Sequence, residues 1–301
     1  KSYELFLASR GCPFDCSYCF IHLYRELYKG KAKGLRLRSP QDVVDEIKYV
    51  HEKHGIQNVM FIDSTFNLNK RWVIEFCNLF AEQTDLPMTC NVRADLMDDE
   101  IAQALAKARC NPARFAIETG NEYLRNSLLA KKLNDGQIYY TVSLFKKYKI
   151  PFVTFNMMGL PTETLEMAWQ TIYMNRKLDP NVLNIDMFMP YPNLNLTKYA
   201  EKEGLIDKES FKKMIEGRNK MFRSVLKQKE IREVSNLHKF SILLIRFPKL
   251  EKIIKKLLHF PENSIFDGVY GFSQVIEFMG WTHVSKKRAI LEIVKNFREL
   301  T

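Results

Sequence analysis

Three cysteines stand close together near the start of the sequence. The stretch "SRGCPFDCSYCF", residues 9–20, places Cys12, Cys16 and Cys19 in a C-x3-C-x2-C spacing, and no fourth cysteine follows within twenty residues. Thiolates are soft ligands that suit zinc and iron-sulfur clusters. A four-iron cluster takes one ligand per iron, so three cysteines would leave one iron open to a small molecule. The spacing therefore predicts a 4Fe-4S cluster with an open coordination position.

A structural metal site is the alternative interpretation of these cysteines. A zinc knuckle, or a group of buried cysteines, would need a further thiol from Cys77, Cys90 or Cys110. Those three are scattered along the chain, which does not suggest an auxiliary cluster, and buried cysteines behave as small hydrophobic residues. We expect all three to be buried in the core.

The first 190 residues predict the strands that would position the cysteine loop. Six short apolar runs alternate with amphipathic segments, and two of them are nearly continuous in apolar residues, as in strands covered on both faces. The runs cover residues 3–8, 58–63, 87–92, 114–118, 152–158 and 182–188. The cysteine loop follows the first run directly, so it lies at the C-terminal end of a strand, where parallel barrels build their active sites.

The amphipathic segments between the runs predict helices. Ser39 suits the N-cap of the first, with Pro40 at its first helical position and an apolar stripe through Val43, Ile47 and Val50. Similar segments cover residues 68–82, 98–108, 135–148 and 164–177. Repeated strand-helix units of this length predict an α/β fold with right-handed crossovers, either a parallel barrel or a doubly wound sheet.

The cysteine loop resembles that of a known family. "CPFDCSYC" is similar to the signature loop of the radical S-adenosylmethionine (SAM) enzymes. In that family the open iron chelates the amino and carboxylate groups of SAM, and an electron from the cluster cleaves the sulfonium. The resulting 5'-deoxyadenosyl radical abstracts a hydrogen from the substrate, so the cofactor does the difficult chemistry. The resemblance implies an enzyme that uses a 4Fe-4S cluster and SAM.

Further motifs, in order through residue 205, resemble the cobalamin-binding subgroup of this family. They are "RSPQDVVDEI" (38–47), "FIDSTFNLN" (61–69), "NVRADL" (91–96), "AIETGNEYLR" (116–125), "GLPTETLE" (159–166) and "PYPNLNLTKYAEKEGL" (190–205). The resemblance implies a partial (β/α)6 TIM-type barrel whose open side faces the substrate. We therefore expect a core barrel over residues 1–200 and a basic, helical C-terminal region over residues 201–301.

The resemblance also implies which side chains contact SAM, while it identifies no catalytic residue. Tyr18 matches the aromatic residue that lies against the adenine, and the backbone of Phe20 is a partner for the adenine edge. Asp63 and Ser64 match positions that hold the SAM amino group, although the family has a second acidic residue where Ser64 stands. Arg93 is expected to pair the SAM carboxylate through its planar guanidinium.

Four later residues complete the expected SAM contacts. Glu118 and Thr119 match positions that contact the ribose and the methionine part, and Asn156 and Tyr191 are weaker matches. Phe155 stands where the family has a glycine, and "GLPTET" replaces "GLPGET", so the fine geometry of that strand end does not transfer. A different role remains open for every strand-end residue, because polar side chains there often cap a neighbouring helix.

Cobalamin use and the reaction type remain open at this stage. Proteins of the subgroup usually carry an N-terminal cobalamin domain, yet the sequence starts two residues before its first predicted strand and contains no "DxHxxG" cobalamin motif. We expect either a segment of a longer protein, which we favour, or a member that works without cobalamin. The reaction would be methyl transfer to an unactivated carbon with cobalamin, or cyclisation, rearrangement or dehydrogenation through hydrogen abstraction.

The positive charge is concentrated in the C-terminal region. The chain has a formal net charge of +11, and residues 201–301 hold 21 Lys and Arg against 13 Asp and Glu. Residues 211–256 alone hold 14 against four, with cations interleaved among Phe, Leu and Ile. We favour a helical lid on the barrel with solvated lysines; the alternative is a basic amphipathic surface that docks on an anionic membrane.

Location, partners and rival functions follow from the same features. No apolar run approaches the length of a membrane span and no signal peptide opens the sequence, so we expect a cytoplasmic protein, with peripheral membrane binding as an option.

Expected partners are a small-molecule, lipid or peptide substrate and an electron donor such as flavodoxin or ferredoxin. An RNA-modifying radical SAM enzyme is an alternative that the basic C-terminal region suggests. It would want a small β-barrel RNA-binding module, whereas this region is predicted to be helical, so nucleic acid is not the partner that we favour. A non-enzymatic iron-sulfur or zinc protein is the remaining alternative.

Overall fold

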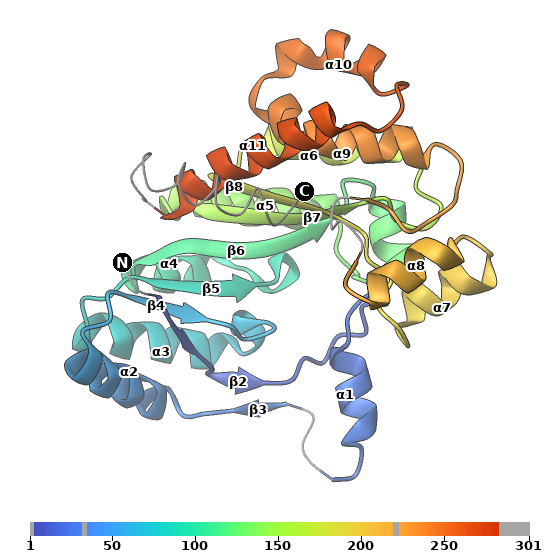
Figure 1. The fold of residues 1–301 in the computed structure, drawn as a ribbon. Helices are drawn as coiled ribbons and strands as arrows, with labels where there is room; N and C mark the ends of the chain where they lie inside the picture. The colour runs from blue at the N-terminus through green and yellow to red at the C-terminus, as the bar shows by residue number, and fades with distance from the viewer. Residues whose placement is uncertain (1–2, 32–34, 219–222, 283–301) are drawn as a thin grey trace. The chain divides into compact units, whose positions relative to one another are not determined.

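The central feature of the fold is a six-stranded sheet in the order β1-β4-β5-β6-β7-β8 (Figure 1). The computed structural model describes residues 3–31, 35–218 and 223–282. β1 pairs in parallel with β4, β4 with β5, and β5 with β6. The strands are β1 (Tyr3–Phe6), β4 (Asn58–Phe61), β5 (Met88–Val92), β6 (Cys110–Glu118), β7 (Phe152–Met158) and β8 (Val182–Met187). All six predicted strands are confirmed, and β6 begins earlier than its predicted run.

Helices alternate with these strands, which gives the partial (β/α)6 TIM-type arrangement predicted for this α/β chain. They are α2 (Pro40–His54), α3 (Lys70–Gln83), α4 (Asp99–Lys107), α5 (Asp135–Lys147), α6 (Leu165–Leu178) and α7 (Asn195–Lys202). Ser39 caps α2 as expected: its side chain accepts a hydrogen bond from Asp42 N at 3.2 Å. The next four helices are capped in the same way by Asn69, Asp98, Asn134 and Thr164. Each cap pairs a backbone N–H that the helix itself leaves unpaired, which fixes where the helix begins.

A small second sheet flanks the cysteine loop and was not expected from the sequence. β2 (Ser9–Arg10) pairs antiparallel with β3 (Arg36–Leu37). The short helix α1 (Ile21–Leu27) lies between them in the chain. The cysteine loop is therefore bounded by β2 on one side and α1 on the other.

Two compact units make up the chain, and each is described by itself. The first holds residues 1–116 and 130–153, and the second holds residues 117–129 and 154–301. This division follows internal contacts and passes through β6 and β7. It is a different division from the expected boundary at residue 200, which stays a prediction.

The first unit is built around aromatic packing between β4 and α3. The Phe61 ring lies 4.8 Å from Phe66 and 5.3 Å from Phe76, and Trp72 stacks on Phe76 at 5.2 Å. The cysteines outside the loop, Cys77, Cys90 and Cys110, are buried as expected. The core behind the cysteine loop is thus dense and apolar.

The second unit joins β7 and β8 to the C-terminal helices. These are α8 (Lys208–Ile215), α9 (Ile231–Arg246), α10 (Glu251–Leu257) and α11 (Ser264–Thr282). The apolar stripe of α9 packs into the core that covers one face of β8; its members include Leu183, Ile185, Val234, Leu237, Phe240 and Leu244. None of the described helices has the length and apolar content that crossing a membrane requires.

The C-terminal helices also cover the free edge of β8, the last strand in the sheet order. Glu277 of α11 accepts a hydrogen bond from Leu183 N at 2.9 Å and pairs with Arg246 of α9. His238 Nε2 lies 2.9 Å from Ile185 O, so this nitrogen carries the proton, and burial lowers the pKa of His238 to about 4. Side chains thereby satisfy backbone groups that an open edge would expose to other chains.

Candidate active site

The cysteine loop runs from the end of β2 into α1 in the first unit. Gly11 precedes it with a φ of +97°, in a region that glycine adopts without a Cβ clash, and this lets the chain turn out of β2. Cys16 is buried, while Cys12 and Cys19 are half-buried, and Cys19 N donates to Cys16 O at 3.1 Å. The three thiols therefore share one short, locally bonded loop.

The donor set of this loop suits an iron-sulfur cluster. Cys12 Sγ lies 3.8 Å from the Thr65 hydroxyl, and Cys16 Sγ lies 3.9 Å from Arg93 Nη1, and such donors stabilise thiolate or cluster sulfur. Within residues 3–31, 35–218 and 223–282, no three His, Cys, Asp or Glu side chains are gathered closely enough to hold a metal ion. The ligand types and their environment fit, and the assignment of Cys12, Cys16 and Cys19 stays a prediction.

Arg93 is the main anchor of the cysteine loop. It follows β5, is largely buried, and forms a two-pronged pair with Asp95 through Nε at 2.9 Å and Nη2 at 3.0 Å. Nη2 also donates to Lys131 O at 2.8 Å, and the guanidinium carbon lies 3.5 Å from the centre of the Phe14 ring. Its guanidinium is thus already engaged on several sides, where the sequence predicted a partner for the SAM carboxylate.

The backbone of Arg93 is fixed as well. Asn67 Nδ2 donates to Arg93 O at 3.0 Å, and Asn67 Oδ1 accepts from Arg93 N at 2.9 Å. Asn67 lies in the short segment after β4, so it ties that strand end to the end of β5. Arg93 is held rigidly at the point where it meets the loop.

Asp63 connects the end of β4 to the segment that enters the cysteine loop. Its two carboxylate oxygens accept hydrogen bonds from Ala8 N at 3.2 Å, Ser9 N at 2.5 Å and Ser9 Oγ at 2.5 Å. Burial raises the pKa of Asp63, and these donors counter that effect. The side chain predicted to hold the SAM amino group therefore orders the backbone that leads into the loop.

The other predicted SAM residues of the first unit differ in their surroundings. Tyr18 is half-buried, with its hydroxyl 3.4 Å from Lys131 Nζ. Phe20 is exposed, and its ring makes an edge contact with Tyr24 at 5.6 Å. Ser64 is exposed beside the buried Asp63. Tyr18 and Phe20 flank Cys19 in the chain, and of the two it is Phe20 that presents an exposed side chain.

In the second unit, Glu118 and Thr119 end β6 as predicted. Both are buried, and Glu118 has a φ of +72°, a region that side chains other than glycine rarely occupy. Thr119 Oγ1 lies 3.3 Å from the Thr171 hydroxyl, and Thr119 O accepts from Arg125 Nε at 3.1 Å and Nη2 at 2.9 Å. Strained backbone held by a buried arginine is typical of functional strand ends.

Asn156 is linked to Thr119 through α6. Asn156 faces the helix layer, where its Oδ1 accepts from Asn175 Nδ2 of α6 at 3.0 Å, and Asn175 also pairs with Thr154. Asn175 Nδ2 further donates to Thr171 O at 2.9 Å, and the Thr171 hydroxyl lies 3.3 Å from Thr119 Oγ1. Tyr191 is exposed in the turn after β8, and its carbonyl accepts from the Thr197 hydroxyl at 2.6 Å. The surroundings of Asn156 support a structural role in packing β7 against α6.

Two residues near the loop were missed by the sequence reasoning. Arg25 of α1 donates to Cys12 O at 3.1 Å and pairs with Asp15 inside the loop. The only signal in the sequence is a basic residue six positions after Cys19. Asp95 was also missed, because nothing in "NVRADL" marks it as the partner of Arg93.

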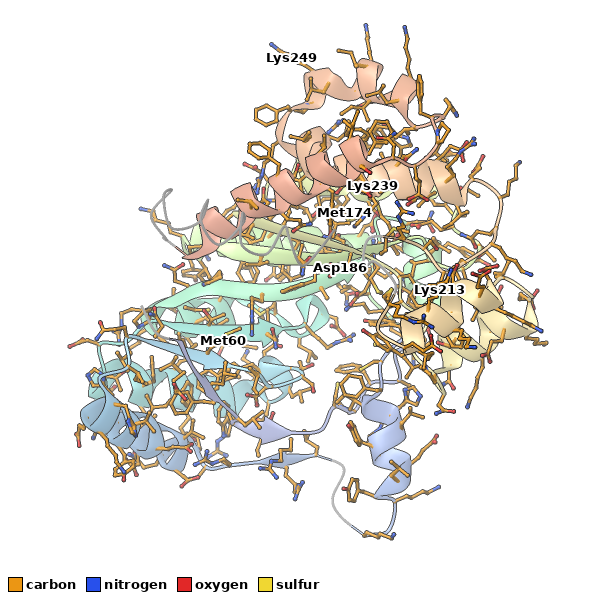
Figure 2. All side chains as sticks on the ribbon, in the orientation of Figure 1. Met60, Met174, Asp186, Lys213, Lys239 and Lys249 are labelled. Atoms are coloured by element: carbon orange, nitrogen blue, oxygen red, sulfur yellow. The ribbon has the colours of Figure 1, made fainter. Side chains whose placement is uncertain are left out.

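Asp186 is a further polar group that the sequence did not single out. Leu183, Ile185 and Met187 of β8 face the helix core, and side chains alternate along a strand, so Asn184 and Asp186 point to its opposite face. Figure 2 labels Asp186. The side chain of Asp186 is accessible to water although protein encloses it on most sides, and this enclosure raises its pKa. It is a candidate for contact with a bound molecule.

Sequence comparison identifies relatives of the chain. The profile of the Radical SAM superfamily matches residues 6–173, more than half of the chain. An uncharacterized methyltransferase of Pyrococcus horikoshii is 28% identical over 201 residues, which cover 66% of this chain and 42% of that protein. The anaerobic magnesium-protoporphyrin IX monomethyl ester cyclase of Rubrivivax gelatinosus is 26% identical over 207 residues, covering 67% and 36%. The chain thus spans less than half the length of these relatives.

Comparison with solved structures identifies the same fold. The cobalamin-dependent S-adenosylmethionine radical enzyme OxsB, solved with aqua-cobalamin and S-adenosylmethionine bound, superposes with a TM-score of 0.57. The alignment covers 98% of this chain and 49% of that chain at 14% identity. The fold of the chain is that of a radical SAM barrel.

Proposed function

Since the chain belongs to the radical SAM superfamily of enzymes, we propose that Cys12, Cys16 and Cys19 bind a 4Fe-4S cluster that takes SAM at its open iron. When bound, such a cluster supplies the electron that cleaves the sulfonium of SAM to a 5'-deoxyadenosyl radical. One observation carries the assignment: the three thiols share a loop in which a guanidinium and a hydroxyl lie beside the sulfur atoms. That loop falls inside the matched range 6–173.

The residues around the loop support this assignment by what they hold in place. Arg93 fixes Phe14 and approaches Cys16, and Arg25 fixes the carbonyl of Cys12. Asp63 orders the backbone that leads into the loop. A loop fastened at its entry, middle and exit has already lost part of its conformational entropy, although the three thiols must still be drawn together to bind a cluster.

The reaction that we propose is radical methyl transfer with cobalamin, and cyclisation by hydrogen abstraction is the second candidate. The relatives include a methyltransferase as well as a cyclase, and the enzyme of similar fold was solved with cobalamin. The chain covers less than half the length of these relatives, so the use of cobalamin is itself part of the proposal. We expect a small-molecule, lipid or peptide substrate and an electron donor such as flavodoxin or ferredoxin.

Anaerobic reconstitution with iron and sulfide tests the cluster and the SAM chemistry. We expect a brown protein that, once reduced, converts SAM to 5'-deoxyadenosine, detected by mass spectrometry. Cys16→Ala should lose both the colour and the product, whereas Cys77→Ala, which changes a buried cysteine outside the loop, should keep both. Full iron content and product formation by Cys16→Ala would overturn the assignment.

A second measurement separates the two reactions. Methyl transfer leaves S-adenosylhomocysteine from the SAM that donates the methyl group, whereas cyclisation leaves none. The reconstituted protein, supplied with cobalamin and with a cell extract as substrate source, should form S-adenosylhomocysteine together with 5'-deoxyadenosine. Formation of 5'-deoxyadenosine alone under these conditions would favour cyclisation.

A further inference from the structure

Helix α10 and its flanking turns expose large apolar side chains. Phe247, Ile253 and Phe260 are 57%, 61% and 55% exposed. The opposite side of the helix is anchored, because Ile254 and Leu258 are buried in the core of the second unit. Figure 1 shows α10 as an outer element of this unit, with α9 between it and β8. The segment of α10 and its flanking turns is therefore anchored on one side and exposes three large apolar side chains to water on the other.

Three lysines surround these apolar groups. Lys249, Lys252 and Lys256 are exposed on the same segment, and Figure 2 shows Lys249 at the outer edge of the unit. Among the described residues none of the three takes part in an ion pair, and the acidic neighbours are engaged elsewhere: Glu251 pairs with Arg176 and Lys255, and Glu262 pairs with Lys239. The positive charge of this surface is left uncompensated.

Helix α9, in the middle of the basic segment, does not share this character. In α9 the apolar residues Leu237, Phe240 and Leu244 are buried in the core, so they are not available to a membrane. From α9 onward, residues 247–260 are therefore the part of the basic segment that carries both exposed apolar groups and exposed lysines. Figure 1 follows this segment from the end of α9 through α10.

We propose that residues 247–260 dock the protein on an anionic membrane. Exposed Phe and Ile side chains insert at the boundary between headgroups and acyl chains, while lysines beside them are attracted to anionic lipid. A nucleic acid would be bound by the charge but would gain nothing from three apolar groups that face outward. The inference does not depend on the reaction, and it places the protein at an interface where apolar substrates are concentrated.

Co-sedimentation with vesicles tests this surface on the whole chain. Vesicles of phosphatidylcholine alone are compared with vesicles that also contain phosphatidylserine, each at low and at high salt. We expect binding to the anionic vesicles that high salt weakens, and little binding to the neutral ones. Binding to nucleic acid or heparin without binding to anionic vesicles would overturn the proposal.

Matched variants then locate the surface. The triple change Lys249→Glu, Lys252→Glu and Lys256→Glu should reduce partitioning by at least about 100-fold, since each lysine contributes roughly fivefold. The control reverses three exposed lysines of α7 and α8, Lys198, Lys202 and Lys208, and should weaken binding far less. Equal loss in both variants would show that net charge alone drives binding and would overturn the proposal.

Apolar insertion is tested separately. Phe247→Ser with Ile253→Ser removes two exposed side chains that make no large contribution to the core, so the fold should be kept, as checked by thermal unfolding. We expect at least a tenfold loss of binding at high salt, where charge attraction is screened. Unchanged binding by this folded variant would exclude insertion and overturn the proposal as stated.

Discussion

Replacing Arg93 by methionine tests whether this side chain anchors the cysteine loop or serves mainly to bind a ligand. The change removes the two-pronged bond to Asp95, the bond to Lys131 O and the approach to Cys16 Sγ, while it keeps an apolar stem against Phe14. We expect the loop to open more readily, because its middle would lose the group that fastens it to β5. The rest of the first unit should keep its fold.

The magnitude follows from burial. The side chains of Arg93 and Asp95 are only 8% and 14% exposed. Removing one partner of a buried ion pair leaves the other charge uncompensated and typically costs about 3–5 kcal/mol. The unpaired carbonyl of Lys131 adds about 1 kcal/mol. We therefore expect the free energy of unfolding of Arg93→Met to fall by roughly 4–6 kcal/mol, a large part of the stability of an ordinary domain.

Urea unfolding and thiol labelling together provide the assay. Alkylation of Cys16 under reducing conditions, followed by mass spectrometry, should be at least about tenfold faster in Arg93→Met, while buried Cys77 should serve as an internal reference. Asp95→Asn added to Arg93→Met should recover about 1–3 kcal/mol, because the uncompensated charge is gone. A loss of stability below about 1 kcal/mol with unchanged Cys16 labelling would refute the anchoring role.

Three further predictions concern other buried carboxylates. Burial raises the pKa of Glu163 to about 8, so the stability that this group contributes is complete below pH 4.5 and is lost as pH rises through about 8. Glu163→Gln should therefore reduce the pH dependence of the unfolding free energy by up to about 1.4 kcal/mol per pH unit in this range. An unchanged pH dependence in urea unfolding would contradict this. In Asp63→Asn an NH2 donor replaces one carboxylate oxygen and faces a backbone N–H, which is also a donor, so the unfolding free energy should fall by about 1–3 kcal/mol. Unaltered thermal unfolding would be the contrary result. Glu118→Gln should keep the iron content of the reconstituted protein but weaken SAM binding by about 10–100-fold in equilibrium dialysis; an unchanged Kd would make Glu118 a structural residue.

The fold was predictable because its signals are local. Ser39, Asp98 and Thr164 each stand where a helix begins, and each accepts the backbone N–H expected of an N-cap. The apolar runs indicated the strands because most residues of strands β5 to β8 are buried, as in parallel strands that are covered on both faces. The small β2-β3 sheet was not predicted because two-residue strands are too short to show a periodic pattern of apolar residues.

The division of the chain into two compact units could not be predicted from the sequence, for a different reason. The composition changes near residue 200, where the alternation of strands and helices stops. The contacts instead join β7, β8 and α6 to α9 and α11, through packing among residues far apart in the chain. No local pattern records that Leu183 packs near Leu237, so only the folded chain reveals it.

Asp63 and Arg93 of the candidate site show most clearly what the sequence could not predict. Motif positions correctly placed both residues at strand ends beside the cysteine loop, but a motif cannot say which partner takes up a side chain. Buried polar atoms must be paired, and the nearest donors and acceptors here belong to the protein: Ala8 and Ser9 for Asp63, Asp95 for Arg93. Contact with SAM by either residue would therefore require it to give up bonds that now order the loop. Phe20 follows Cys19 and its side chain is 55% exposed, so it could meet a molecule bound at the proposed cluster without that cost. Its substitution should therefore weaken SAM binding with less effect on loop order than that of Arg93.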